Sequence, residues 1–260
     1  MKQIKGTHKW VHLNNITMSK IIRNVVIESH EADLLSQANI ITLFSHTLDT
    51  AGYASNGRAY SIDALQEQGL SWVLSRFAIE VNRYPKQFEE ITIETWIEDI
   101  NKLVSTRNFQ IFDKNRELIA KACSLWSMID QNTRRPVNLL ETLYKDAPIL
   151  AEANDMERPV RILEVKGEKV DEVKVRYSDI DFNQHANSAR YIKWQLDSYN
   201  LDMFKEKQVK RFDINFVQEV LFGEKIEVYK EEKENMHSFD LKNESGRSVC
   251  KTIFTWEDKK

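Results

Sequence analysis

The sequence Tyr177-Ser-Asp-Ile-Asp-Phe-Asn-Gln-His-Ala-Asn-Ser-Ala-Arg-Tyr-Ile-Lys-Trp194 places three polar side chains at alternate positions, directly before an amphipathic segment. These side chains are Asp181, Asn183 and His185. Alternate residues of an extended segment point to the same side of the chain. We therefore expect a carboxylate, a carboxamide and an imidazole to converge at the start of a helix over residues 187–200. Helix N-termini stabilise anionic oxygen, so this combination is suited to hydrolysis of an activated acyl group.

The second half of the chain repeats the first half weakly but in the same order. Residues 27–49 align with residues 175–197, and the apolar positions of the two helices that follow match as well. Farther along, Trp126 aligns with Trp256. The offset in residue number between aligned positions becomes smaller along the chain, as expected if the second copy has shorter loops. An ordered series of matches favours a tandem duplication, with one apolar stripe at helical spacing in each copy.

Each copy shows the pattern of a strand, a loop, a helix and then a series of strands. Glu90-Ile-Thr-Ile-Glu-Thr-Trp-Ile97 alternates polar and apolar residues, as a half-buried strand does. Asp113-Lys-Asn-Arg116 and Asn243-Glu-Ser-Gly246 predict turns between neighbouring strands. The predicted fold class is α+β, with two antiparallel sheets that each curl round a central helix. Further strands are expected at 103–112, 118–129, 225–231, 237–242 and 249–256.

A chain of 260 residues is long enough for two domains of about 130 residues each. Thr133-Arg-Arg-Pro136 closes the first unit, and residues 138–158 predict a helical or irregular connector that is interrupted by proline. We therefore expect an N-terminal domain over residues 1–150 and a C-terminal domain over residues 151–260.

The composition indicates a folded protein without a broadly basic surface. Hydrophobic residues make up 42% of the chain and aromatic residues 10%, which is enough to supply two cores. The net charge is −3, from 37 basic and 40 acidic residues, so the chain lacks the basic field that drives non-specific nucleic-acid binding.

Cys123 and Cys250 both lie in apolar, strand-like runs, which favours reduced thiols and a cytoplasmic location. The N-terminus lacks the apolar core of a signal peptide, and no run is long enough to cross a bilayer. We therefore expect neither export nor membrane insertion. No metal site is expected either, because the cysteines and the remaining histidines lack the spacing of metal ligands. Those histidines are His8, His12, His30, His46 and His237.

Six segments of the chain resemble one known family. Asp181–Trp194 closely resembles the active-site segment of the acyl-acyl-carrier-protein (acyl-ACP) thioesterases, double-hotdog enzymes of plant plastids and bacteria. Phe216-Val-Gln-Glu219 resembles the family's later active-site strand. The resemblance covers residues 20–257 and implies a tandem hotdog fold in which the first domain binds the acyl chain. The segments that resemble the family's first domain are Trp72-Val-Leu-Ser-Arg-Phe77, Val81-Asn-Arg-Tyr-Pro85, Thr95-Trp-Ile97 and Ser124-Leu-Trp-Ser-Met-Ile-Asp-Gln-Asn-Thr-Arg-Arg135.

Carried over residue by residue, the resemblance implies a catalytic set of Asp181, Asn183, His185 and Glu219. Asp181 would attack the acyl carbon or activate water, and Asn183 would orient a carboxylate or the water. His185 would donate to the carbonyl or to the departing sulfur, and Glu219 would hold or activate the hydrolytic water. Backbone N–H groups at the start of the following helix could stabilise the oxyanion.

The sequence departs from the family pattern beside Glu219. The family commonly has a cysteine at the next position, where this chain has Val220. A thiolate nucleophile is therefore impossible there, and carboxylate chemistry is favoured. Val217 and Gln218 stand where the family usually has arginines, so contacts assigned to those arginines do not transfer.

The first copy provides an internal control for these assignments. Of the four candidate side chains, only the aspartate is kept there. A half without the polar set suits binding of an acyl chain better than catalysis, and we expect the tunnel walls on the 39–53 helix and the 70–82 strand. The equivalent residues of the first copy are Asp33, Leu35, Gln37 and Tyr84.

The predicted function is hydrolysis of acyl-ACP to free fatty acid and holo-ACP, which would terminate fatty acid synthesis. No bound cofactor is expected, because the phosphopantetheine arm arrives with the substrate. The expected partner is acyl carrier protein, which could meet Arg134, Arg135 or the basic run Lys205-Glu-Lys-Gln-Val-Lys-Arg211. Such runs are more often solvated faces, and association into a homodimer stays open.

Three other functions stay open as well. The protein could hydrolyse acyl-coenzyme A, act as a hotdog dehydratase, or bind acyl groups without catalysis. Without the resemblance, polar residues before a helix would be interpreted as caps and turn formers. Asn187 is well placed as such an N-cap and is not part of the catalytic set.

Overall fold

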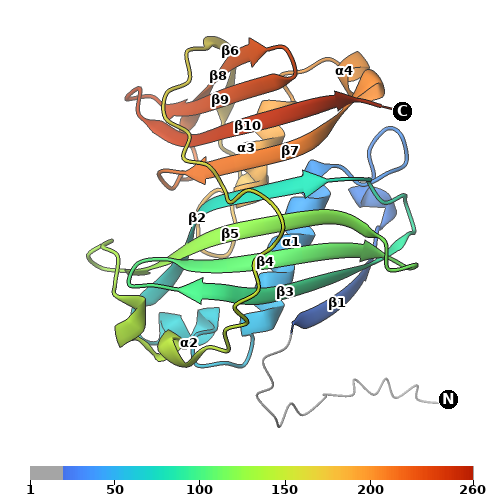
Figure 1. Cartoon of the computed structure of the whole chain (residues 1–260). Helices are drawn as coiled ribbons and strands as arrows, with labels where there is room; N and C mark the ends of the chain where they lie inside the picture. Colours follow the sequence, from blue (N-terminus) through green and yellow to red (C-terminus); the bar gives the residue numbers. More distant parts are fainter. Residues whose placement is uncertain (1–19, 260) are drawn as a thin grey trace, which may run out of the picture.

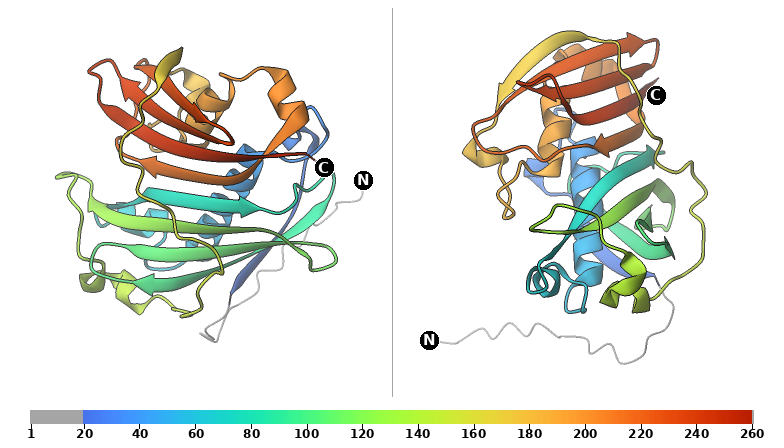
Figure 2. Two further views of the ribbon diagram at one scale, coloured as in Figure 1. Left: turned by 45° about the horizontal axis from the view of Figure 1, so that its top comes forward. Right: turned by 90° about the vertical axis from the view of Figure 1, so that its left-hand side faces the viewer.

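One ten-stranded antiparallel sheet runs through the whole protein, with its strands in the order β1-β3-β4-β5-β2-β7-β10-β9-β8-β6 (Figure 1). The computed structural model describes residues 20–259. The predicted lack of a signal peptide, as well as His8 and His12, lies outside the described residues. Two helices, α1 (Ile40–Ser55) and α3 (Ser188–Leu196), cover the same face of the sheet (Figure 2). No helix of the described part is both long and apolar enough to cross a membrane.

The N-terminal half wraps five strands round α1. Asn39 begins this helix, because its side-chain oxygen accepts a hydrogen bond from the backbone N–H of Thr42 at 3.1 Å. The helix predicted at this position is confirmed. The other elements of this half are β1 (Ile21–Val26), α2 (Ile62–Gln66), β2 (Leu70–Val81), β3 (Glu90–Ile100), β4 (Ser105–Asp113) and β5 (Leu118–Asp130).

The C-terminal half repeats this plan round α3. Asn187 is the N-cap, since its side-chain oxygen accepts from the backbone N–H of Ala189 at 2.9 Å. The single helix predicted over 187–200 is wrong at its end, because α3 stops at Leu196 and Asn200 caps a new short helix. The other elements are β6 (Glu168–Lys174), α4 (Leu201–Glu206), β7 (Lys207–Phe216), β8 (Lys225–Lys233), β9 (Met236–Asn243) and β10 (Ser248–Asp258).

One apolar core lies between the helices and the sheet and continues from one half into the other. Phe44 of α1 packs edge-on against Phe77 of β2, with ring centroids 4.9 Å apart, and against Phe212 of β7 at 6.5 Å. All three rings are fully buried, and each contributes about 1.5–3 kcal/mol through burial. Because Phe212 belongs to the C-terminal half, packing against α1 also positions the two halves relative to each other.

Strands β2 and β7 pair edge to edge and join the two halves. The pairing runs from Arg76 opposite Asn215 to Glu80 opposite Arg211. Across this seam the guanidinium of Arg211 also contacts the carboxylate of Glu80. The predicted α+β class and tandem hotdog arrangement are confirmed, and the two predicted sheets are continuous with each other through this pair of strands.

The connector between the halves, residues 147–167, crosses the face of the sheet opposite the helices (Figures 1 and 2). Asn154 anchors it, because its side-chain amide donates to the carbonyl oxygens of Phe109 and Ala122, both at 2.9 Å. The boundary expected near residue 150 lies in this connector, and the division into two independent domains stays a prediction.

Candidate active site

A tight loop over residues 181–185 holds the first three candidate residues. Asp181 closes the loop: its carboxylate Oδ1 accepts from the backbone N–H groups of Asn183 at 2.8 Å and His185 at 3.4 Å. Its own backbone N–H donates to the His185 carbonyl at 2.9 Å. Gln184 has a φ of +65°, which reverses the chain. The extended segment predicted here is therefore wrong, and a turn presents the polar side chains instead.

Glu219 approaches this loop from the segment that follows β7. Its carboxylate Oε2 lies 3.4 Å from His185 Nε2. The guanidinium of Arg134, from the turn after β5, contacts the same oxygen. The sequence indicated Arg134 only as a residue for docking. Its place beside Glu219 depends on how the two halves meet, which local sequence patterns do not encode.

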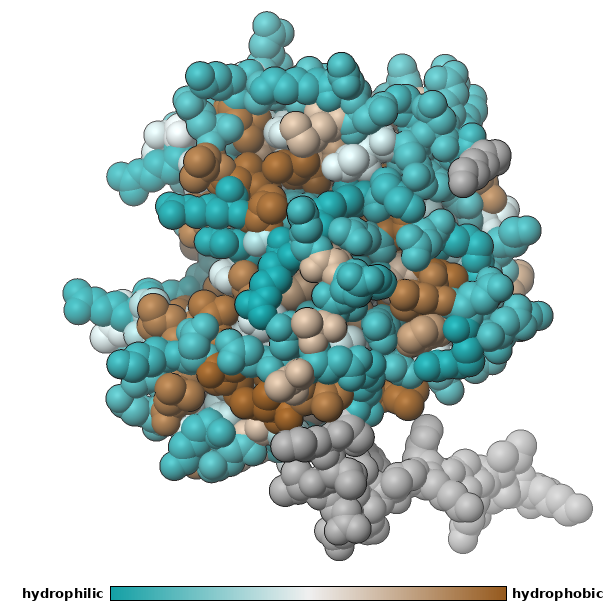
Figure 3. Space-filling model, in the orientation of Figure 1, coloured by the Kyte–Doolittle hydropathy of each residue, from teal (hydrophilic) through white to brown (hydrophobic). Residues whose placement is uncertain are grey.

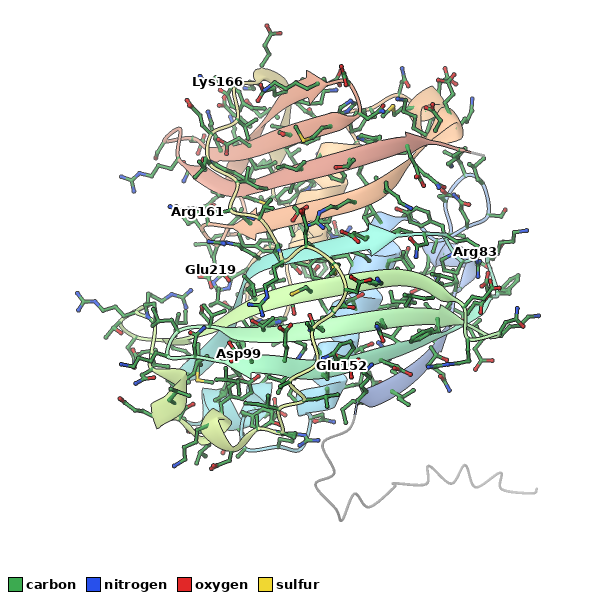
Figure 4. All side chains as sticks on the ribbon, viewed as in Figure 1. Arg83, Asp99, Glu152, Arg161, Lys166 and Glu219 are labelled. Carbon is green, nitrogen blue, oxygen red and sulfur yellow. The ribbon has the colours of Figure 1, made fainter. Side chains whose placement is uncertain are left out.

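All four predicted residues and Arg134 line one pocket of about 460 Å³ between the two halves. Figure 3 shows a notch between the halves at the left edge, at the level where Figure 4 labels Glu219. The side chains of His185 and Glu219 are 28% and 39% exposed, so substrate and water can reach both. The apolar and hydroxyl side chains of the pocket wall include Trp72, Leu74, Ile129, Ser188, Tyr191 and Phe216.

The start of α3 offers one free backbone donor to this pocket. The N–H groups of Ala186, Asn187 and Ala189 donate to other groups of the protein, at 2.8–2.9 Å. Among residues 20–259, the N–H of Ser188 has no such partner, and Ser188 lines the pocket. Of the backbone groups predicted to stabilise an oxyanion, Ser188 N–H is therefore the available one.

Neither cysteine is placed to act as a nucleophile in this pocket. Cys123 and Cys250 are the only cysteines of the chain, and both are buried and unpaired. Burial raises the pKa of the Cys123 thiol to about 12 and that of the Cys250 thiol well above its ordinary value. Neither lines the pocket, and Val220 beside Glu219 is fully buried. The carboxylates and the imidazole are thus the reactive groups at hand.

The same loop recurs in the N-terminal half at residues 33–37. Asp33 Oδ1 accepts from the backbone N–H groups of Leu35 at 2.8 Å and Gln37 at 3.3 Å. Ser36, which is equivalent to Gln184, also has a positive φ, of +57°. The loop geometry therefore belongs to the repeated fold, and the polar side chains are what distinguish the second copy.

The pocket beside this first loop is nearly closed. Tyr84, at the position equivalent to Glu219, is buried and donates its hydroxyl to the carbonyl of Val209 at 2.9 Å. The remaining cavity measures only about 40 Å³. Of the two equivalent pockets formed by residues 20–259, the C-terminal one is the one large enough to admit a substrate group.

A second cavity, of about 120 Å³, lies inside the N-terminal half between α1 and the sheet. Trp72 lines both this cavity and the polar pocket, so this residue separates the two. Arg107 also lines it, and within the described part of the chain no carboxylate pairs with this buried guanidinium. Burial lowers the pKa of Arg107. The cavity lies along the predicted tunnel elements and is lined by Leu48, Ala51, Gly52, Tyr60, Trp126 and Tyr144.

These features define a double hotdog protein with an open polar pocket and a largely apolar cavity beside it. The chain belongs to the acyl-ACP thioesterase family. The model of the family's N-terminal domain matches residues 19–147, and that of its C-terminal domain matches residues 163–258. An acyl-ACP thioesterase from Bacteroides thetaiotaomicron, known from a crystal structure, shares 33% sequence identity with this chain, and the two structures superpose with a TM-score of 0.86. The match covers 92% of this chain and 98% of that one.

Plant proteins are similar as well. A chloroplastic acyl-[acyl-carrier-protein] hydrolase of Cuphea viscosissima is 26% identical over 270 residues, which cover 95% of this chain. The chain spans 62% of the length of that relative. The structure of the 12:0-ACP thioesterase from Umbellularia californica shares the fold, with a TM-score of 0.80 at 17% identity over 95% of this chain and all of that one. The predicted family is thus confirmed.

Proposed function

We propose that this protein hydrolyses acyl-ACP to free fatty acid and holo-ACP, and so ends acyl-chain synthesis. The observation that carries the proposal is the convergence of Asp181, Asn183, His185 and Glu219 on one open pocket that shares a wall with an apolar cavity. The Bacteroides and Cuphea proteins carry this activity in their names. The polar pocket would receive the thioester, and the cavity behind Trp72 would receive the acyl chain.

Glu219 is the group best placed to activate water. Its Oε2 is engaged by Arg134 and faces His185, whereas its Oε1 has no hydrogen-bond partner among residues 20–259. Asp181 likewise has one engaged oxygen, Oδ1, which accepts two backbone N–H groups, and an Oδ2 without a hydrogen-bond partner among residues 20–259. What distinguishes Glu219 is its contact with Arg134 and its 3.4 Å approach to His185, and these favour Glu219 as the base and Asp181 as the residue that holds the loop.

The hydrolytic step follows from these positions. Glu219 accepts a proton from water, and the water oxygen forms a bond to the acyl carbon. The N–H of Ser188 and the side-chain amide of Asn183 stabilise the oxyanion of the tetrahedral intermediate. The C–S bond then breaks, and the proton taken up by Glu219 passes through His185 to the departing sulfur, which returns both side chains to their starting protonation states. A thiol of pKa about 8.5 leaves readily, so no stronger acid is needed.

The proposal includes no bound cofactor, since the pantetheine thiol belongs to the substrate and the protein supplies only acid–base groups. Acyl carrier protein is the proposed partner. A reducing compartment such as the cytoplasm is proposed as the location, because both cysteines are buried, free thiols.

A thiol-release assay over a series of acyl-ACPs tests this function. The wild-type protein should release holo-ACP thiol and free fatty acid, and Glu219→Gln should lose about 10²–10⁴-fold in turnover. A strong preference for matched acyl-CoA would replace the proposed substrate. An enoyl product without free thiol would indicate a dehydratase, and acyl binding without any turnover would indicate a binding module.

A further inference from the structure

We infer that Arg134, supplied by the N-terminal half, is a positioning residue that orients Glu219 in the pocket of the C-terminal half. This inference rests on the proposed function. It makes the catalytic centre a product of both copies, although all four predicted catalytic residues come from the second.

The contacts of Glu219 carry the inference. The Arg134 guanidinium donates to Oε2 of Glu219, and the same oxygen lies 3.4 Å from His185 Nε2. A carboxylate side chain on a partly exposed segment can rotate freely unless one of its oxygens is held. The arginine holds that one oxygen near His185, so the free oxygen, Oε1, is left to receive a proton.

The backbone around Arg134 is held in place as well. Asp130 Oδ1 accepts from the backbone N–H of Thr133 at 2.7 Å and of Asn132 at 3.1 Å, and these bonds lower the pKa of the Asp130 carboxyl. The backbone N–H of Arg134 donates to the Asp130 carbonyl at 2.9 Å. The base of the turn is closed by a bridge between Ile129, which lines the pocket, and Pro136.

Arg134 itself adopts a left-handed backbone conformation, with a φ of +57°. Such a conformation is costly for a residue other than glycine. The positive φ of Gln184 recurs in its equivalent, Ser36, and so belongs to the fold. Phe88, Arg116 and Glu234 also have positive φ, so the conformation of Arg134 belongs to its turn, and the contact with Glu219 carries the inference.

Docking of the carrier protein is the competing explanation, and the two roles predict different kinetics. A docking cation acts on the encounter of the two proteins, so its loss raises KM. Because salt screens the attraction, this effect on KM becomes smaller at high ionic strength. A positioning residue acts on the bound state, so its loss lowers kcat. Arg247 provides the control, because it is an exposed arginine between β9 and β10 and does not line the pocket.

The test measures kcat and KM for acyl-ACP hydrolysis with the full chain. Arg134→Gln should lower kcat about 10–100-fold with little change in KM, and Arg134→Lys should restore part of the loss. Arg247→Gln should behave as wild type. In a Glu219→Gln background, Arg134→Gln should add almost nothing, because its effect passes through the glutamate.

Two results would overturn the inference: an effect of Arg134→Gln on KM alone, or losses that multiply in the double variant. Thermal unfolding of each variant checks that the fold is intact, and Arg134→Lys keeps the charge if the glutamine variant is unstable. An inactive wild-type protein would refute the proposed function. An active wild type with an equally active Arg134→Gln variant would refute this inference alone.

Discussion

The loops at residues 33–37 and 181–185 share one backbone and differ in chemistry. Both are closed by an aspartate that accepts two backbone N–H groups, and both contain one residue with positive φ. The C-terminal loop presents Asn183 and His185 to an open pocket, whereas its counterpart faces a cavity of about 40 Å³. The shared aspartate is therefore evidence of a structural role, and the side chains that differ are the better candidates for catalysis.

Exchange of the histidine with its counterpart should have the largest effect. His185→Gln installs the residue found at the equivalent position, Gln37, and removes the imidazole that faces Glu219. We expect turnover to fall about 10²–10⁴-fold with an unchanged unfolding temperature, measured by thiol release and circular dichroism. The reciprocal control, Gln37→His, should leave turnover unchanged. Retained activity in His185→Gln would remove the imidazole from the mechanism.

The two aspartates should separate stability from activity. Asp33→Ala and Asp181→Ala each remove an acceptor of two backbone N–H groups, so both should fold but lose about 1–2 kcal/mol of unfolding free energy. Only Asp181→Ala should also lose turnover, by about 10²-fold, because its loop carries the reactive groups. Denaturant unfolding and thiol release measure the two quantities. A stability loss confined to one variant would show that the loops are not equivalent.

Asn183 should have a smaller effect on turnover. Asn183→Leu installs the equivalent residue of the first loop, Leu35, and removes one hydrogen-bond donor from an exposed position. A hydrogen bond to a charged oxygen is worth about 1.5–3 kcal/mol, and because water can replace a donor at this exposed position we expect a loss of kcat of about tenfold. A change in KM with constant kcat would instead place Asn183 in ground-state binding.

The smallest effect should come from the segments that follow β2 and β7. Arg83 (labelled in Figure 4) bonds to Glu89 at 2.6 Å and holds the pKa of that carboxyl below its ordinary value. At the equivalent place in the second copy, Gln218 carries no charge. Because the pKa of Glu89 is depressed in the folded state, the Arg83–Glu89 pair contributes to the unfolding free energy near pH 7. This contribution is lost as the pH falls below about 4 and Glu89 becomes protonated.

Arg83→Met should therefore lower the unfolding free energy by at most about 1 kcal/mol at pH 7 and have little effect near pH 2. Chemical denaturation at both pH values measures this difference, with Gln218→Met as the uncharged control. A loss of equal size at both pH values would assign the effect to packing of the arginine stem.

Local patterns predicted the elements well, because caps and alternation act over a few residues. Asn39 and Asn187 begin their helices as expected, and the strand over 90–97 forms, although its alternation of burial ends at Ile93 because residues 93–97 are all buried. The alternation at Asp181, Asn183 and His185 was misleading, because two backbone N–H groups donate to the Asp181 carboxylate and bend this segment into a turn. The four predicted site residues do line one pocket, and their catalytic roles stay proposals.

Two long-range features could not be predicted from local sequence patterns. The pairing of β2 with β7 depends on the relative placement of the two copies, which sequence similarity between them does not specify. Arg134 lies 85 positions from Glu219, and an arginine in an exposed turn is as typical of a solvated surface as of an active site. Its contact with a carboxylate became evident only from the folded arrangement.

The connector between the halves, residues 147–167, has a further consequence. It tethers the two copies covalently, so their association is intramolecular and does not weaken on dilution. A dimer of two identical subunits must have two identical pockets, because each mutation appears in both subunits. Tethered copies are free of that constraint, and one pocket could lose its chemistry while the other kept it.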